Sequence, residues 1–259
     1  MGVNAQTSVP AFTAGQVLTA AEMTEVNTGI PVFATTVTRD AAFGGTGEKV
    51  LAQGQYAYIE ATSTLQVYNG TSWVSAVSSG LVPIVPTSVA VGSGTGSASA
   101  TGQVTFALAS SVSLNGVFSS TYQNYMIVMN IGARSTTNYI RLRWRVGGVD
   151  NTTADYDYQY LRAITTTISA NESLNQTAAD YITSSTNETT TSVGTFSNVF
   201  QNTAEAYFQN QSNVGVPNGP GYLEMLCGGI NASTSFDGVT FFATAGTFSG
   251  LIMIYGMAN

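Results

Sequence analysis

The sequence has no histidine and only one cysteine, Cys227, among its 259 residues. Without imidazole, a Ser-His-Asp triad, a Cys-His pair and a histidine metal site are all excluded. A single cysteine can form neither an intrachain disulfide nor a structural zinc site, which needs about four sulfur or imidazole ligands. Because Cys227 follows the mainly apolar stretch Leu223–Leu226, we expect its thiol to be buried.

Charge is scarce as well. Only 8% of the residues are charged, the net charge is -7, and Lys49 is the one lysine. A polyanion repels such a surface, so we expect no nucleic-acid partner. No apolar run approaches the roughly 18 residues of a membrane span, and the start of the sequence lacks the features of a signal peptide, so we expect no membrane insertion. Threonine, serine, asparagine and glutamine supply 92 residues, which predicts a surface of hydroxyls and amides.

The distribution of proline and glycine predicts two units. Pro83 and Pro86 stiffen the chain, and the glycine-rich stretch 92–102 follows them directly. We therefore place a joint near residue 85, between an N-terminal region of residues 1–85 and a C-terminal domain of residues 86–259.

The N-terminal region combines a short helix with a β-hairpin. Thr19 and Glu22 have the spacing of a capping box, which predicts a helix that starts there and stops near Gly29. Residues 56–59 form an expected strand, and the Asn-Gly step within 65–74 favours a hairpin with a type I′ turn.

The C-terminal domain is expected to be β throughout. Short segments with apolar alternation are separated by clusters of Gly, Asn, Ser and Thr, which is typical of strands and turns. The expected strands are 104–108, 125–131, 139–146, 155–160, 204–208, 222–226, 239–242 and 251–255. The fold class is therefore mainly β, with an antiparallel β-sandwich or jelly-roll-like domain after the small N-terminal region.

A row of charges marks two of these strands. Arg141, Arg143 and Arg145 share one face of the first strand, and Asp155 and Asp157 share one face of the next. We interpret the five as a structural charge ladder across a strand pair, with Ile140–Val146 alternating so that its apolar side chains point inward. The open alternatives are an anion site on the arginines and an acid–base pair for glycoside hydrolysis on the aspartates.

None of the remaining candidate motifs has the residues that its ligand requires. Residues 150–155 lack the alternate ligands and central glycine of a calcium loop. Residues 44–49 place Glu48 between glycine and lysine, so no phosphate-binding loop is formed, and residues 92–97 miss the third glycine of a dinucleotide fingerprint. The sequence thus predicts no catalytic residue, no cofactor and no metal ligand, and we expect the protein not to be an enzyme.

Polar stretches at 165–167, 183–192 and 209–213 are expected to be loops between strands, where binding usually resides. With neighbouring tyrosines they could recognise sugars by stacking and amide hydrogen bonds, or they could simply be soluble loops. The candidate receptor contacts are Tyr181, Thr183, Asn187, Thr190, Asn210 and Asn213.

Several stretches resemble known proteins. The first five are similar to the N-terminal part of phage virion appendage proteins of the tail-fibre type: residues 12–23 (FTAGQVLTAAEM), 29–36 (GIPVFATT), 38–43, 54–60 and 68–73. Residues 118–125, 155–157 and 246–256 resemble the C-terminal β domains of such proteins.

This resemblance implies a homotrimer in the virion, an N-terminal region that docks onto other virion proteins and a distal β domain facing the host. The expected function is that of a short tail fibre or fibre tip which attaches to a host cell-surface glycan. The chain lacks a long shaft repeat, which leaves a head fibre or capsid decoration protein as the alternative. A polysaccharide depolymerase is the third.

Overall fold

The computed structural model describes residues 7, 9, 11–19, 29–45, 48–76, 80–136, 138–183, 189–216 and 219–258. The chain forms two compact units, Met1–Ser79 and Gly80–Asn259. The division precedes the expected joint at residue 85 because β5 (Leu81–Pro83) pairs with β20 (Phe248–Met257) and so belongs to the second unit. The helix expected from Thr19 to Gly29 falls mostly on residues 20–28, which lie outside the described residues.

The first unit is a four-stranded sheet with one short helix. The strands, in the order β1-β2-β3-β4, are β1 (Val32–Phe33), β2 (Tyr56–Ile59), β3 (Thr64–Tyr68) and β4 (Trp73–Ser75). The helix α2 (Thr36–Asp40) begins with a capping box in which Thr35 and Thr38 satisfy each other's backbone amides. Phe33 and Ile59 are fully buried in the small core of this unit.

The expected hairpin forms as β3 and β4, but its turn is of another type. Asn69 donates its amide to the carbonyl of Ser72, so Gly70 and Thr71 are the central residues. Gly70 has a φ of 99°, whereas Thr71 keeps a negative φ. A type I′ turn needs positive φ at both central residues, so the predicted type I′ turn is wrong.

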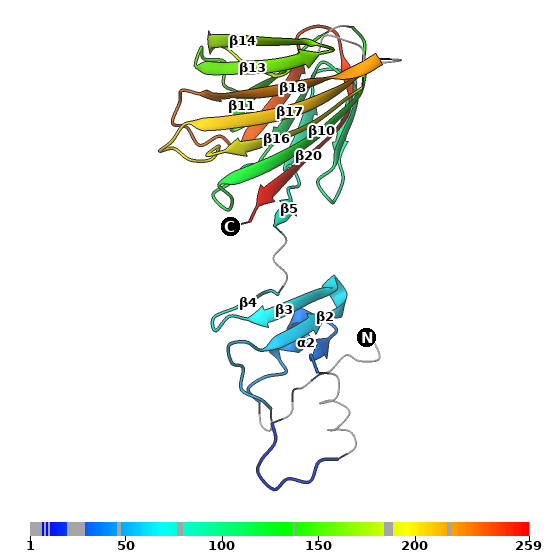
Figure 1. The fold of residues 1–259 in the computed structure, drawn as a ribbon. Coiled ribbons are helices and arrows are strands. Elements are labelled where there is room, and N and C mark those ends of the chain that lie inside the picture. Colours follow the sequence, from blue (N-terminus) through cyan, green and yellow to red (C-terminus); the bar gives the residue numbers. More distant parts are fainter. Residues whose placement is uncertain are drawn as a thin grey trace. The chain divides into compact units, whose positions relative to one another are not determined.

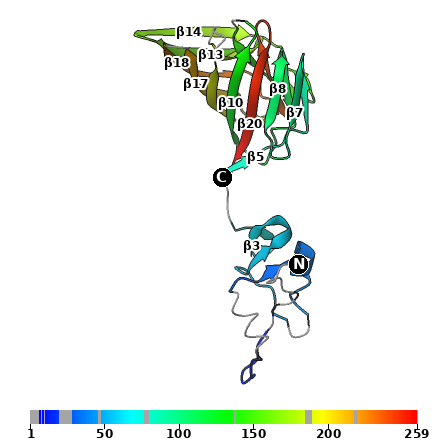
Figure 2. The ribbon, with the colours of Figure 1, turned by 90° about the vertical axis from the view of Figure 1, so that its right-hand side faces the viewer.

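The second unit is a sandwich of two antiparallel sheets (Figures 1 and 2). The large sheet runs β14 (Thr167–Gln176), β13 (Tyr156–Ile164), β18 (Gly219–Ile230), β17 (Ala206–Val216), β16 (Thr190–Ser197), β10 (Asn124–Arg134), β20, β8 (Val104–Ala109) and β7 (Thr95–Ala98), with β5 beside β20. The small sheet runs β12 (Val149–Asp150), β11 (Ile140–Val146), β19 (Gly238–Ala243), β9 (Ser111–Asn115) and β6 (Ser88–Val91), with β15 (Ala179–Ile182) beside β11. The predicted antiparallel β-sandwich is confirmed.

Alternation along the strands builds the core between the two sheets. The Trp144 ring meets the Phe196 ring edge-on, with 4.6 Å between centroids, and both side chains are fully buried. Edge-to-face pairs of this kind stabilise beyond their buried area by about 0.5 to 1.5 kcal/mol each. The inward face predicted for 140–146 holds for Ile140 to Trp144, but Val146 at the strand end is 44% exposed.

The glycine-rich stretch 92–102 is not the predicted joint. It connects β6 of the small sheet to β7 of the large sheet and turns from β7 toward β8. At Gly94, whose φ is +70°, a Cβ atom would stand 2.0 Å from the carbonyl oxygen of Ala107. The glycine therefore allows a close backbone crossing within the sandwich. Among the described residues, no helix is long and apolar enough to cross a bilayer.

Candidate functional site

The candidate receptor contacts are mostly interior residues. Tyr181 and Thr183 are fully buried, and Thr190 and Asn210 are 1% exposed, so the prediction that they contact a receptor is wrong. Residues 209–213 are part of strand β17 and not a loop, and their even-numbered side chains point into the sandwich. Asn213 is exposed, and Asn187 lies outside the described residues.

Asn210 lies at the centre of a buried hydrogen-bond network. Its Nδ2 donates to the backbone oxygen of Tyr181 at 2.5 Å and to Oγ of Ser212 at 2.9 Å, and its Oδ1 accepts from Oγ of Ser192 at 2.6 Å. Thr190 accepts from the buried guanidinium of Arg134 at 3.0 Å. Buried amides and hydroxyls are tolerated because they are paired in this way. These residues stabilise the sandwich and are not available to a ligand.

Glu224 anchors Thr183 from the neighbouring sheet. Its two carboxylate oxygens accept from the Thr183 backbone amide at 3.1 Å and from the Thr183 hydroxyl at 2.8 Å. Burial raises the pKa of Glu224 above the ordinary value, and the hydrogen bonds from Thr183 and the charges of Arg162 and Arg134 counteract only part of that rise.

The predicted charge ladder has different acidic partners. β11 and β13 lie in different sheets, so Asp155 and Asp157 do not face the arginines, and that pairing is wrong. The reason is local: Gly147 and Gly148, with φ of 55° and 82°, close a two-residue hairpin from β11 to β12 before the chain crosses to the large sheet.

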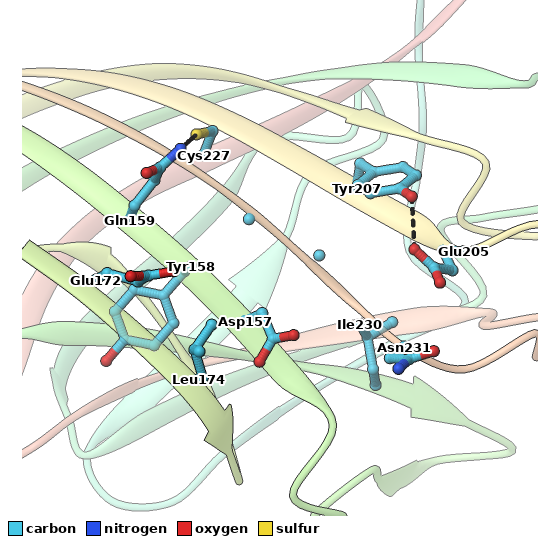
Figure 3. Close-up of a pocket in the computed structure, with 12 residues that line it drawn as sticks. Asp157, Tyr158, Gln159, Glu172, Leu174, Glu205, Tyr207, Cys227, Ile230 and Asn231 are labelled. Atoms are coloured by element: carbon cyan, nitrogen blue, oxygen red, sulfur yellow. Dashed lines mark hydrogen bonds between the residues drawn. The ribbon is translucent and has the colours of Figure 1, made fainter.

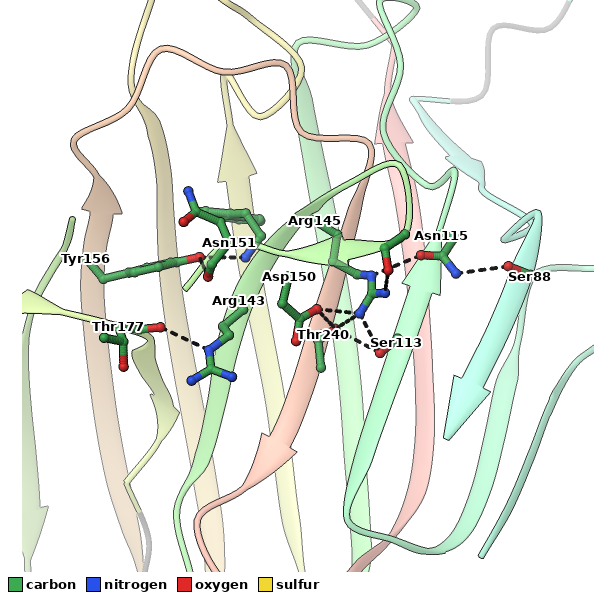
Figure 4. Close-up of polar contacts among 12 residues, drawn as sticks. Ser88, Ser113, Asn115, Arg143, Arg145, Asp150, Asn151, Tyr156, Thr177 and Thr240 are labelled. Atoms are coloured by element: carbon green, nitrogen blue, oxygen red, sulfur yellow. Dashed lines mark hydrogen bonds and ion pairs between the residues drawn. The ribbon is translucent and has the colours of Figure 1, made fainter. Parts of the chain in front are cut away.

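All three arginines are nevertheless engaged in contacts within the fold, and Figure 4 shows those of Arg143 and Arg145. Arg141 forms an ion pair with Asp180 at 2.6 Å. Arg143 donates to the Thr177 carbonyl at 3.0 Å, and its guanidinium lies 4.7 Å from the Phe242 ring centroid.

Arg145 makes the most contacts of the three. It pairs with Asp150 and donates to Oγ of Ser113 at 2.8 Å and to Oδ1 of Asn115 at 3.0 Å. Oγ1 of Thr240 accepts from Arg145 and donates to Asp150. Arg141 and Arg145 are thus paired with acids of the small sheet, whereas Arg143 contacts a carbonyl and an aromatic ring.

A groove lies on the outward face of the large sheet, over β13, β14, β17 and β18 (Figure 3). Its volume is about 370 Å³. The lining residues are Asp157, Tyr158, Gln159, Glu172, Leu174, Glu205, Tyr207, Cys227, Gly228, Gly229, Ile230 and Asn231. A second hollow of about 510 Å³ shares Gln159, Glu172 and Cys227 with it, so the two form one continuous depression.

Strand register explains the hollow. Asp157 on β13, Gly229 on β18 and Tyr207 on β17 are direct neighbours across the sheet, and all three face outward. The glycine between the carboxylate and the phenol carries no side chain, which leaves room above the sheet. A Cβ atom on Gly229 would stand 2.8 Å from Cδ1 of Tyr207, so a side chain at this position would collide with the edge of the ring.

Tyr207 is held in place at the groove wall. Its hydroxyl donates to a Glu205 carboxylate oxygen at 2.5 Å, and that hydrogen bond is the main reason why the pKa of Tyr207 is raised. Its side chain is 47% exposed, so the face of the ring is available to a ligand. The carboxylate of Asp157 accepts a hydrogen bond from the backbone amide of Asn175 at 2.7 Å, which orients it at the opposite wall.

Cys227 lies exposed in the groove, so the prediction of a buried thiol is wrong. In β18 the inward positions are Glu224 and Leu226, and the alternation turns Met225 and Cys227 outward. Gln159 donates an amide hydrogen to its sulfur at 3.6 Å.

The groove offers carboxylates, amides and one aromatic face, which suits a hydroxyl-rich ligand. Asp157 is the one predicted site residue that lines it, and Asp155 is not among the lining residues. Within the described part of the chain, no group of three or more His, Cys, Asp or Glu side chains is placed to hold a metal ion. Sequence reasoning missed Tyr207, Glu205 and Glu172, although the period of two along 205–213 already puts Tyr207 on the side opposite to Phe208.

Comparison with protein-family models, curated proteins and solved structures finds no match to this chain. The case for its function therefore depends on the residues themselves.

Proposed function

We propose that this protein is a phage virion appendage of the tail-fibre type, whose second unit attaches to a host cell-surface glycan through the outward groove. The observation that carries the proposal is the cross-strand row of Asp157, Gly229 and Tyr207. It sets a hydrogen-bond acceptor and an exposed aromatic face on opposite sides of a hollow, the combination by which proteins bind the hydroxyls and the apolar face of a sugar ring.

The first unit is proposed to attach the chain to other virion proteins. The support is the resemblance of five stretches to the N-terminal part of phage appendage proteins, namely residues 12–23, 29–36, 38–43, 54–60 and 68–73.

Self-association is proposed as well, with a homotrimer as the state that the resemblance implies. The outward faces of β10, β16 and β20 support it. Val193, Val128 and Met253 lie side by side across these strands, and no outward side chain between Met126 and Asn130 or between Thr191 and Thr195 is charged. Each copy carries a net charge of -7, so the electrostatic repulsion between copies is smallest where their uncharged faces are in contact.

An array of purified bacterial surface polysaccharides tests the proposal. We expect the full-length chain to bind a subset saturably and Tyr207→Ala to weaken that binding about tenfold or more, which corresponds to about 1.4 kcal/mol. Tyr56→Ala is the matched control, because Tyr56 is a 45% exposed tyrosine of the first unit and does not line the groove.

Two results would replace the proposal. If no polysaccharide is bound and labelled protein is found on the virion head, a head fibre or decoration protein without a receptor is the better account. If reducing ends are released and the release is lost in Asp157→Asn, the protein is a depolymerase.

A further inference from the structure

We infer that the groove accepts glycans without acid groups and rejects acidic glycans such as uronic-acid, sialylated or phosphorylated chains. The inference names the ligand class of the site proposed above and rests on that proposed function.

The first observation is the sign of the charges in the groove. Asp157, Glu172 and Glu205 line it, and no arginine or lysine does. Glu205 is engaged with the Tyr207 hydroxyl and Asp157 with the Asn175 amide, both neutral donors, so neither carboxylate is paired with a cation there. An acidic sugar in this groove would meet like charges at close range, and each such contact costs affinity.

The second observation is where the cations of the second unit are. Arg141 and Arg145 form ion pairs with Asp180 and Asp150 on the small sheet. Arg143 lies over Phe242 on the same sheet.

The other two arginines of the unit are also turned away from the groove. Arg162 is opposite Glu224 across β13 and β18 and donates to the Thr183 carbonyl at 3.3 Å, on the inward side of the large sheet. Arg134 is buried and donates to Asn138 and Thr190. Lys49 and Arg39, the remaining cations of the chain, belong to the first unit. No cation of the second unit is therefore free to bind a carboxylate or phosphate in the groove, so the groove lacks the charge-assisted hydrogen bonds that bind such groups most strongly.

The third observation is that neutral contacts are available. The Tyr207 ring, the amides of Gln159 and Asn231 and the exposed apolar side chain of Leu174 all line the hollow. These groups bind hydroxyls, acetamido groups and the apolar face of a pyranose without needing charge.

The single cysteine makes the electrostatic part of the inference measurable. Cys227 lines the groove and is the chain's one thiol, so its reaction rate reports the local potential in the otherwise unmodified full-length protein. We expect a cationic methanethiosulfonate (trimethylammonium-ethyl) to react about tenfold or more faster than the anionic sulfonatoethyl reagent at low salt, after each rate is divided by that with a free thiol. High salt should shrink the ratio.

The matched variant is the triple substitution Asp157→Asn, Glu172→Gln, Glu205→Gln, in which the ratio should fall close to one. The fold of the triple variant is checked by circular dichroism. If it does not fold, the single substitution of the exposed Glu172, Glu172→Gln, replaces it and should lower the ratio in part. Equal rates for the two reagents in the wild-type chain would overturn the inference.

The polysaccharide array supplies the second readout. Binding confined to polymers without acid groups supports the inference, whereas saturable binding of a uronic-acid or sialylated polymer overturns it and leaves glycan attachment intact. If nothing on the array is bound, glycan attachment itself fails, while the reagent ratio still decides whether the groove repels anions.

Discussion

The two faces of the large sheet use similar residues for opposite purposes. On β17, Asn210 points inward and holds three hydrogen bonds in the core, while its neighbour Gln209 points outward. On β18, the carboxylate of Glu224 is fully buried, whereas Cys227 is exposed in the groove. In this protein a polar residue is therefore not always a binding residue. Because side chains alternate along a strand, an odd or even position decides whether the residue points into the core or outward.

The largest expected effect separates the two faces directly. Asn210→Ala leaves the Ser192 hydroxyl and the Tyr181 carbonyl without their partner in the core, so we expect the free energy of unfolding to fall by about 2 to 4 kcal/mol. Gln209→Ala, one residue away and exposed, should change it by less than about 0.5 kcal/mol. Urea denaturation of both variants is the measurement, and equal losses would show that the faces do not differ as described.

An intermediate effect is expected at Gly229. A Cβ atom there would stand 2.8 Å from Tyr207 and 2.9 Å from the Ala206 carbonyl oxygen. We expect Gly229→Ala to cost about 1 to 3 kcal/mol of stability through overpacking and to displace the Tyr207 ring, so that glycan binding falls as well. Urea denaturation and array binding together check this. Full binding with a displaced ring would remove Tyr207 from the site.

A pH dependence is expected from the inward face. Because burial raises the pKa of Glu224 above 4.5, the folded chain keeps a proton that the unfolded chain has released. The resulting contribution to stability is fully present below about pH 4.5 and is lost as the pH rises through the raised pKa. Glu224→Gln cannot titrate, so the stability of the wild type minus that of the variant should fall as the pH rises.

Urea denaturation at several pH values between 4 and 8 measures this difference. Gln209→Ala on the outward face is the control, because it changes no titratable group, and its stability should follow the pH dependence of the wild type. A difference that stays constant or increases with pH for Glu224→Gln would contradict the assigned cause.

The smallest effect on stability is expected on the uncharged outward face that includes Val193, Val128 and Met253. Val193 is 46% exposed, so Val193→Lys should change the free energy of unfolding by less than about 0.5 kcal/mol. If copies associate through this face, the added charge should nevertheless dissociate them, which sedimentation velocity can detect. Thr105→Lys, on the outward side of β8, is a comparison outside this face. An unchanged assembly would place the contact between copies elsewhere.

The fold class could be predicted from the sequence because the alternation of apolar and polar residues along a strand depends only on neighbouring residues. The period of two in Ile140–Val146 and the apolar segments at 104–108 and 251–255 correctly predicted strands of a sandwich. The pairing of the strands could not be predicted in the same way. The strand at 139–146 was expected to pair with the strand at 155–160, but Gly147 and Gly148 form a hairpin that pairs β11 with β12.

The site was harder to predict for the same reason. Asp157, Gly229 and Tyr207 are distant in sequence, and their contact depends on a register that β13, β18 and β17 acquire only when the sheet assembles. The polar run 209–213 resembles a loop by composition, although its alternate residues fill the core. Composition alone does not show which amides lie inside the sandwich and which lie outside.

The most direct test of the groove as the attachment site uses Cys227 itself. Complete alkylation of this thiol by a bulky maleimide should abolish binding to the polysaccharides that the unmodified chain recognises, because the adduct fills the hollow that Cys227 lines. Cys227→Ser should bind these polysaccharides normally and be insensitive to the reagent. Undiminished binding by the fully alkylated protein would contradict the account.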